Sequence, residues 1–261
     1  MTPVSVVQGA SPLILGLPHT GTFVPDDVRG CLNETGCKLA DTDWHIDQLY
    51  QGLLPEITTV KANYHRYFVD VNRDPEGHSL YPGQNTTPLV PLTDFDDQNI
   101  WDTPPDGAEV QRRLAISHAP YHAAMQAEID RVHALHGFVI HYDCHSIRSD
   151  IPFLFEGQLP VLNIGTNDGS TCAPAISKIV EDIARSSGYS MVVNGRFKGG
   201  WTTRHYARPN QGVHTIQLEI AQRAYLTNEA APWVYDINKA DVLRQTLQSI
   251  LTSLNSWRPA Q

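Results

Sequence analysis

Two apolar runs of strand length, each followed by a histidine, constrain the fold of this chain more than any other feature of its sequence. Residues 13–17 lead to His19, and residues 138–140 lead into the polar tract 141–145, which ends at His145. Short apolar runs next to glycine or proline are typical of buried strands in a parallel sheet. Ligands bind beyond the carboxyl ends of such strands, so both histidines are expected at a functional edge of the sheet.

The order of the expected elements favours an α/β fold, with a mostly parallel central sheet between two layers of helices. The segments predicted as strands are 12–17, 57–61, 65–71, 137–143, 160–164, 190–194 and 213–220. The segments predicted as helices are 43–54, 107–136, 173–187 and 238–256. Pro120 predicts a break or kink within the second of these helices. The length fits one three-layer α/β/α domain over residues 1–261 better than two small domains.

A long proline-rich stretch at residues 75–106 has little periodicity. Its prolines are Pro75, Pro82, Pro88, Pro91, Pro104 and Pro105. Loops of this length are uncommon inside a compact domain and are often lids or binding loops. Because the stretch directly follows Asn72 and Arg73, we expect it to cover a substrate; a rigid structural excursion is the alternative.

Charge and composition argue against several classes of partner. The formal net charge is −9, which disfavours general binding to nucleic acid or to an anionic membrane surface. No apolar run reaches 18 residues and the amino terminus has no basic segment, so neither a membrane span nor a signal peptide is expected. The four cysteines include no CxxC pair and are expected to be reduced thiols. A cytoplasmic location is therefore expected.

Two histidines and an inward-facing aspartate form a candidate metal site. His19 and His145 occupy equivalent positions at strand ends, and Asp43 shares the apolar face of the predicted helix 43–54. A carboxylate that faces the protein interior is costly unless it is paired, caps a helix or binds metal. Helix capping by Asp43 and purely structural hydrogen bonds of the histidines are the alternatives, with Asp47 and His45 as further candidate ligands. Imidazole and carboxylate suit zinc, although manganese, cobalt and iron accept the same ligands.

Glu219 is the candidate general base, because it stands near the end of an otherwise apolar predicted strand. A carboxylate beside a zinc-activated water can take its proton and transfer it to a leaving nitrogen. A salt bridge from Glu219 to Arg223 or Arg204 is the structural alternative. His141 and Asp143 share the strand face of the second histidine and are candidates to support the metal ligands.

Arginines close to these elements indicate an anionic substrate. Arg66 and Arg73 flank the predicted strand 65–71. A second group of cations surrounds the glycine-rich tract 199–203 and comprises Arg196, Lys198, Arg204 and Arg208. A guanidinium can bind a carboxylate through two hydrogen bonds, which lysine cannot reproduce. In an acidic chain, such a glycine-rich loop with four cations is a candidate anion pocket.

Taken together, these tracts resemble the N-formylglutamate amidohydrolase family. The similar tracts span most of residues 11–226 and lie at 18–21, 41–45, 69–73, 80–87, 143–146, 199–206 and 218–220. Each tract is weakly specific alone, whereas their combined order is strongly so. The resemblance implies a zinc-carboxypeptidase-like α/β/α fold. It also implies hydrolysis of N-formyl-L-glutamate to formate and L-glutamate, a step of bacterial histidine degradation.

The resemblance further implies roles for individual residues. The residues that would hold one divalent metal, most simply zinc, are His19, Asp43 and His145. Glu219 would be the general base, and the residues that would bind the substrate carboxylates are Arg73, Asn72 and Arg204. The zinc-peptidase pattern His-x-x-Glu is absent, since Thr22 stands at the glutamate position. The alternative functions are deacylation of another N-acyl amino acid, peptide hydrolysis and non-catalytic binding of an anion.

Overall fold

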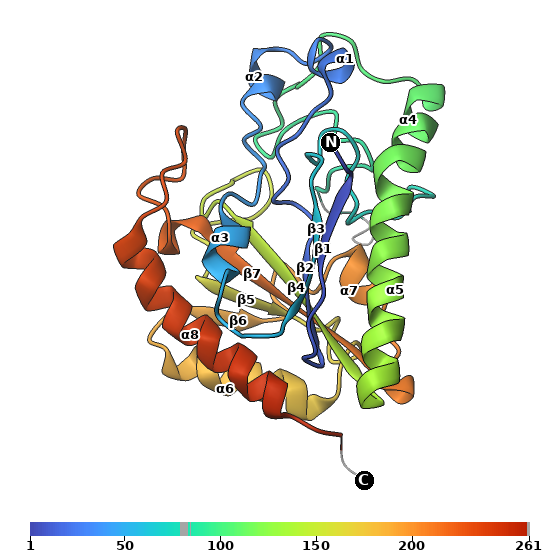
Figure 1. Ribbon diagram of the computed structural model, residues 1–261. Helices are drawn as coiled ribbons and strands as arrows, with labels where there is room; N and C mark the ends of the chain where they lie inside the picture. The colour runs from blue at the N-terminus through green and yellow to red at the C-terminus, as the bar shows by residue number, and fades with distance from the viewer. Residues whose placement is uncertain (79–82, 84, 260–261) are drawn as a thin grey trace.

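The computed structural model describes residues 1–78, 83 and 85–259, and a seven-stranded sheet lies at the centre of these residues (Figure 1). The strands are β1 (Val4–Val7), β2 (Leu13–Leu17), β3 (Thr58–Ala62), β4 (Val139–Ile147), β5 (Leu162–Gly165), β6 (Met191–Val193) and β7 (Val213–Ala221). Their order across the sheet is β1-β3-β2-β4-β7-β5-β6. The pairs β1–β3 and β5–β7 are antiparallel and the other four are parallel, which confirms the mostly parallel sheet.

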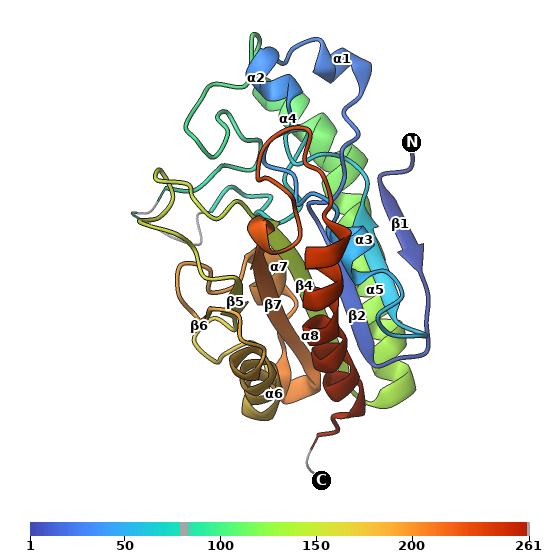
Figure 2. The same cartoon turned by 90° about the vertical axis from the view of Figure 1, so that its left-hand side faces the viewer.

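Helices cover both faces of the sheet, as Figures 1 and 2 show. The longer helices are α5 (Ala119–His136), α6 (Pro174–Ser186) and α8 (Ile237–Ser256). The shorter helices are α1 (Asp26–Arg29), α2 (Glu34–Cys37), α3 (Ile46–Tyr50), α4 (Gly107–Arg113) and α7 (Trp201–His205). Helices α5 and α7 pack on one face, and α3, α6 and α8 pack on the other. The predicted three-layer α/β/α architecture is therefore confirmed.

The two central strands, β4 and β7, direct apolar side chains to one face of the sheet. Near their carboxyl ends, they direct polar side chains to the other face. Ile140, Tyr142 and Cys144 of β4 pack into the core formed with α3, α6 and α8. Val139 faces α5, and His145 shares its side of the strand because side chains alternate along a strand. Strand β7 follows the same alternation and pairs with β4 in parallel, so that His145 lies directly across from Glu219.

The long predicted helix at 107–136 contains the expected interruption. Helix α4 continues into a π-helical turn at Leu114–His118 and then into α5. Pro120 lies in the first turn of α5, where the missing backbone N–H is tolerated. The predictions for α6 and α8 are each correct to within one residue at either end.

The predicted strand at 65–71 is wrong. These residues form a turn and irregular backbone that join β3 to the proline-rich loop. Tyr67, Phe68 and Val69 are buried in a satellite core with Trp101 and residues near α1 and α2. The apolar side chains of this segment are buried under loops. Because buried strands are rich in the same side chains, the sequence resembles that of a strand.

The predicted helix at 43–54 is also too long, because only α3, at Ile46–Tyr50, is helical. His45 has a left-handed backbone (φ 58°), which separates α3 from the turn that contains Asp43. The chain leaves α3 at Gln51 with an extended ψ of 125°. Strand β1 was not predicted; its half-exposed residues pair antiparallel with β3 at the edge of the sheet.

Loops and short helices gather beyond the carboxyl ends of the parallel strands. Figure 2 shows α1, α2 and the neighbouring loops at this end of the sheet. All four cysteines are free thiols, as expected. In the part of the chain that the structure describes, no helix has both the length and the apolar character needed to cross a bilayer.

Candidate active site

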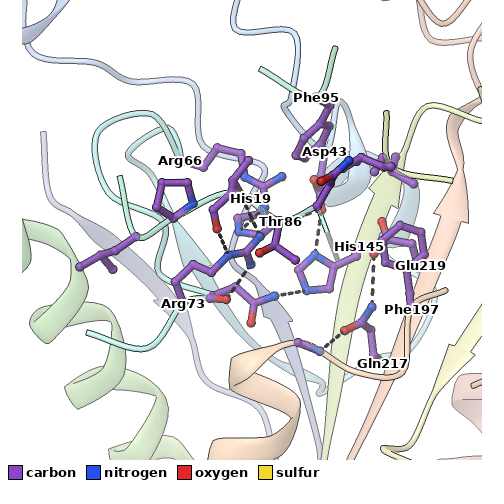
Figure 3. Close-up of a pocket in the computed structure, with 18 of the residues that line it drawn as sticks. His19, Asp43, Arg66, Arg73, Thr86, Phe95, His145, Phe197, Gln217 and Glu219 are labelled. Atoms are coloured by element: carbon purple, nitrogen blue, oxygen red, sulfur yellow. Dashed lines mark hydrogen bonds and ion pairs between the residues drawn. The ribbon is translucent and has the colours of Figure 1, made fainter. Parts of the chain in front are cut away.

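Three buried side chains from separate elements meet at the carboxyl end of the sheet (Figure 3). His19 follows β2, Asp43 lies in the turn before α3, and His145 belongs to β4. The potential ligand atoms of these residues all lie within 4.8 Å of one another. Asp43 Oδ2 is 3.0 Å from Nδ1 of His145 and 3.9 Å from Nδ1 of His19. The structure thus brings together the three residues that the sequence indicated as ligands.

Asp47 and His45, the alternatives to Asp43 as the third ligand, lie away from the two histidines. Asp47 is partly exposed and pairs with Lys61 at 3.0 Å, and His45 Nε2 donates to the carbonyl of Trp233 at 2.7 Å. Asp43 does not cap α3, because its Oδ2 accepts a hydrogen bond from the backbone N–H of Ser146 across the site. Neither Asp47 nor His45 reaches the two histidines at the strand ends, which leaves Asp43 as the carboxylate of the cluster.

Each histidine of the cluster also has a second carboxylate at its other ring nitrogen. His19 Nε2 is 2.6 Å from Asp70 Oδ1, and His145 Nε2 is 3.2 Å from Asp143 Oδ1. Histidines that bind metal characteristically pair their other nitrogen with a carboxylate, which orients the ring and increases its basicity. Both rings therefore present Nδ1 toward Asp43. The donor set of two imidazole nitrogens and one carboxylate oxygen fits a divalent metal such as zinc.

Hydrogen bonds and charges fix the two supporting carboxylates. Asp143 Oδ2 accepts from Thr202 Oγ1 at 2.6 Å and from Thr203 Oγ1 at 2.7 Å, both on α7. Asp70 Oδ1 accepts from a backbone N–H two residues later at 2.8 Å. Burial alone would raise the pKa of Asp70, but His19 and Arg66 hold it well below its usual range. The sequence indicated Asp143 for this role, whereas Asp70 was missed.

Glu219 projects from β7 into the same site. Its Oε2 accepts a hydrogen bond from Gln217 Nε2 at 3.2 Å, in place of a salt bridge to Arg223 or Arg204. Burial raises the pKa of Glu219 to about 8; the nearby His145 opposes this rise and Asp43 adds to it. A carboxylate with a raised pKa beside a candidate metal site is suited to accept and return a proton.

A cavity of about 280 Å³ opens onto this group. It is lined by the candidate ligands and Glu219, and by cations, polar groups and apolar side chains from several loops. The arginines in the lining are Arg66, Arg73 and Arg196, and the apolar residues include Leu89, Phe95, Ile147, Leu154 and Phe197. The proline-rich stretch contributes residues 77–78, 85–89 and 95, while its residues 79–82 and 84 lie outside the described part.

Comparison with known proteins agrees with this geometry. The sequence profile of the family described as N-formylglutamate amidohydrolase matches residues 11–226, which include every residue of the site. This chain belongs to the N-formylglutamate amidohydrolase family.

Two relatives and one solved structure extend the match beyond the family profile. The chain is 42% identical to an N-formylglutamate deformylase from Pseudomonas aeruginosa, over 97% of this chain and 96% of that protein. It is 40% identical to the Pseudomonas putida protein of the same name, with the same coverage. The crystal structure of N-formylglutamate amidohydrolase from Ralstonia eutropha JMP134 is 27% identical and has a TM-score of 0.81, covering 97% of this chain and 98% of that one.

Arg66 is a member of this candidate site that the sequence marked only as a nearby cation. Its Nη2 lies 2.7 Å and 2.8 Å from the two ring nitrogens of His19 and 3.2 Å from Asp70 Oδ2. Its guanidinium also lies over the ring of Phe95, 5.1 Å from the centroid. Arg66 and Asp70 both belong to the segment mistaken for a strand, and this error concealed their position.

The predicted substrate-binding arginines differ in position. Arg73 lines the cavity, and its Nε and Nη2 donate to the carbonyl and hydroxyl oxygens of Thr87, each at 2.9 Å. Asn72 also lines the cavity. Arg204 lies on α7, where its Nε donates to the carbonyl of Gly199 at 3.0 Å, and it is not among the described residues of the lining.

Asn72 is held from three directions. Its Oδ1 accepts from the backbone N–H of Thr202 at 2.9 Å, and its Nδ2 lies 3.1 Å from His145 Nε2. On either side of it, His118 and His122 donate from Nε2 to the carbonyls of residues 73 and 71, at 3.0 Å and 2.8 Å. Helix α5 and the π-helical turn thus position the backbone that carries Asn72.

Proposed function

We propose that this protein hydrolyses N-formyl-L-glutamate to formate and L-glutamate with the help of a divalent metal. The observation that carries the proposal is the meeting of a histidine–aspartate–histidine cluster, Glu219 and arginines around one cavity. Two relatives that are about 40% identical over nearly the whole chain are named N-formylglutamate deformylase, which supports the choice of substrate.

The metal would be held by His19, Asp43 and His145. Asp70 already orients the ring of His19, and Asp143 orients that of His145. When bound, a divalent metal supplies Lewis acidity for the formyl carbonyl and for a water molecule. Zinc suits this donor set best, and the same ligands accept manganese, cobalt or iron. The cluster is buried, and electrostatic interactions are stronger in such surroundings than in bulk water.

Glu219 would move the proton. Its carboxylate takes a proton from the attacking water and returns it to the amide nitrogen, so that the C–N bond breaks and the amine leaves without a negative charge. Gln217 holds one carboxylate oxygen and so fixes the direction of the other. General acid–base catalysis of this kind contributes about 10²–10⁴-fold in rate.

Arg73 and Asn72 would bind a substrate carboxylate near the reacting amide. Arg73 is anchored by Thr87, and Asn72 touches His145 directly. Arg73 also lies 3.6 Å from Asp70, the partner of His19, so both residues are close to the candidate metal ligands. Arg204 remains a prediction for carboxylate binding.

The first experiment measures formate release from N-formyl-L-glutamate, before and after treatment with a chelator and again after zinc is added back. The proposal expects chelation to lower the rate at least about tenfold and zinc to restore it, because the metal supplies the Lewis acid. N-acetyl-L-glutamate and a formylated dipeptide serve as comparison substrates. The absence of formate release by metal-loaded protein, or faster cleavage of either comparison substrate, would contradict the proposed reaction.

Gly200→Ala is expected to lower kcat/KM for N-formyl-L-glutamate by about 10–100-fold, the range for changes next to metal ligands. A Cβ atom at Gly200 would lie 2.4 Å from Asn72 Nδ2, so Asn72 would lose its contacts with Thr202 and His145. Steady-state kinetics provide the measurement. Gly107→Ala is the matched control, because a Cβ atom there meets nothing within 4 Å. Equal kcat/KM in both variants would refute a role for Asn72 in this position.

A further inference from the structure

Arg196 is a cation of the cavity to which the proposed reaction assigns no role. It lies between β6 and α7, and it lines the same cavity as His145 and Glu219. Phe197, the next residue, also lines the cavity, and Figure 3 places it on the side of Glu219, opposite Arg73. The cavity lining therefore contains Arg196 in addition to Arg66 and Arg73.

Backbone carbonyls hold the guanidinium of Arg196 in place. Its Nε donates to the carbonyl of Leu154 at 2.9 Å, and its Nη2 donates to the carbonyl of Asn85 at 2.9 Å. The guanidinium also lies over the ring of Phe197, 5.4 Å from the centroid. These two carbonyls fix the orientation of the guanidinium. An arginine positioned in this way is prepared for a carboxylate.

The other two arginines of the cavity belong to the metal end of the site. Arg66 contacts His19, and both Arg66 and Arg73 lie near Asp70, at 3.2 Å and 3.6 Å. The hydrogen bonds of Arg196 described above go instead to the loop residues Leu154 and Asn85. A carboxylate bound by Arg196 would thus lie farther from the reacting bond than one bound by Arg73.

N-formyl-L-glutamate has two carboxylates, one near the reacting amide and one farther from it. Its α-carboxylate is attached to the carbon that carries the reacting nitrogen, and two methylene groups separate the second carboxylate from that carbon. We infer that Arg196 forms a second carboxylate subsite, which binds the side-chain carboxylate while Arg73 binds the α-carboxylate. Leu154 and Phe197 provide apolar surface beside the subsite for the two methylene groups. This inference rests on the proposed function.

One short segment links the two arginines. Thr87 accepts hydrogen bonds from Arg73, and the carbonyl of Asn85 accepts one from Arg196. Asn85 Nδ2 also donates to the carbonyl of Phe153 at 2.8 Å, which ties the segment to the opposite loop. Residues 85–87 therefore connect the two guanidinium groups through a short stretch of backbone.

The test compares two substrates of equal length, N-formyl-L-glutamate and N-formyl-L-glutamine, in the metal-loaded protein. Arg196→Gln is expected to lower kcat/KM for the glutamate substrate at least about tenfold, because a charge-assisted hydrogen bond is lost. The same variant should change kcat/KM for the glutamine substrate by less than about threefold, since its neutral amide forms no ion pair. Arg185→Gln, on the exposed surface of α6, is the matched control.

Arg196→Lys keeps the charge and tests the geometry of the subsite. It should retain part of the preference for the glutamate substrate that Arg196→Gln loses. Equal losses on both substrates in both variants would mean that Arg196 only holds the loops, and would overturn the inference. Equal activity of the unsubstituted protein on both substrates would also overturn it while leaving the deformylase reaction intact. No activity of the unsubstituted protein on either substrate would overturn the proposed function as well.

Discussion

Glu219→Gln is expected to lower kcat for N-formyl-L-glutamate by about 10²–10⁴-fold. Glutamine has nearly the same shape as glutamate, but its amide cannot take a proton from water or return one to the leaving nitrogen. The hydrogen bond from Gln217 can persist, because the amide oxygen is still an acceptor. Burial raises the pKa of Glu219, so a neutral side chain is tolerated at this position and the fold should be preserved.

The measurement combines steady-state kinetics with metal analysis and calorimetric binding of N-formyl-L-glutamate. The bound metal and the substrate affinity should stay close to those of the unsubstituted protein, since Glu219 is neither a candidate ligand nor a carboxylate-binding group. Glu181→Gln, which removes a partly exposed carboxylate of α6, is the matched control and should be fully active. A Glu219→Gln protein with ordinary kcat would exclude this residue as the base.

Asp43→Asn is expected to weaken metal binding at least about 100-fold and to abolish most formate release, since changes to supporting residues alone cost 10–100-fold. The carboxylate of Asp43 approaches Nδ1 of both histidines in the cluster. Asparagine keeps an oxygen that can accept from the Ser146 N–H, so the local backbone should survive. Removal of the negative charge is therefore the main consequence.

Asp47→Asn is the matched control for this change. Asp47 lies four residues away, is partly exposed and pairs with Lys61, so its loss should leave metal content and activity unchanged. Metal retained after dialysis is measured for both variants and compared with formate release. If Asp47→Asn lost the metal and Asp43→Asn kept it, the ligand assignment would have to be reversed.

The sequence predicted the sheet and the main site residues because their signals are local. The apolar runs of β2, β4 and β7 are long enough to indicate buried strands, and strand alternation places His145 and Glu219 on one face. The two strands were predicted to be parallel, so both side chains were expected at the carboxyl edge. No knowledge of loop conformation was needed for that step.

Asp43 was correctly placed inside the protein, but for a different physical reason from the one that the sequence suggested. Helical periodicity over residues 43–54 put it on the apolar face, yet α3 begins only at Ile46. A turn directs Asp43 inward instead, and its backbone N–H donates to the carbonyl of His19 at 3.0 Å. This contact joins two segments that are distant in the sequence.

Arg66 and Asp70 could not be assigned from the sequence because their roles depend on tertiary contacts. Their segment is buried throughout, as a central strand would be, while its actual partners are His19 and the loop residue Phe95. The choice between Arg196 and Arg204 has the same origin. Both belong to the same cluster of cations in the sequence, and only the fold shows that Arg196 lines the cavity.

The π-helical turn at Leu114–His118 adds one residue to the helix that runs from α4 to α5. His118 and His122 reach the carbonyls on both sides of Asn72 only with this extra residue in place. Without it, one part of the helix would be rotated by about 100° relative to the other. Either Arg113, on the α4 side of the turn, would then lose its hydrogen bond to the carbonyl of Phe68, or the imidazoles would lose their carbonyls. The number of residues in this helix is therefore as constrained as the identity of the residues in the cavity.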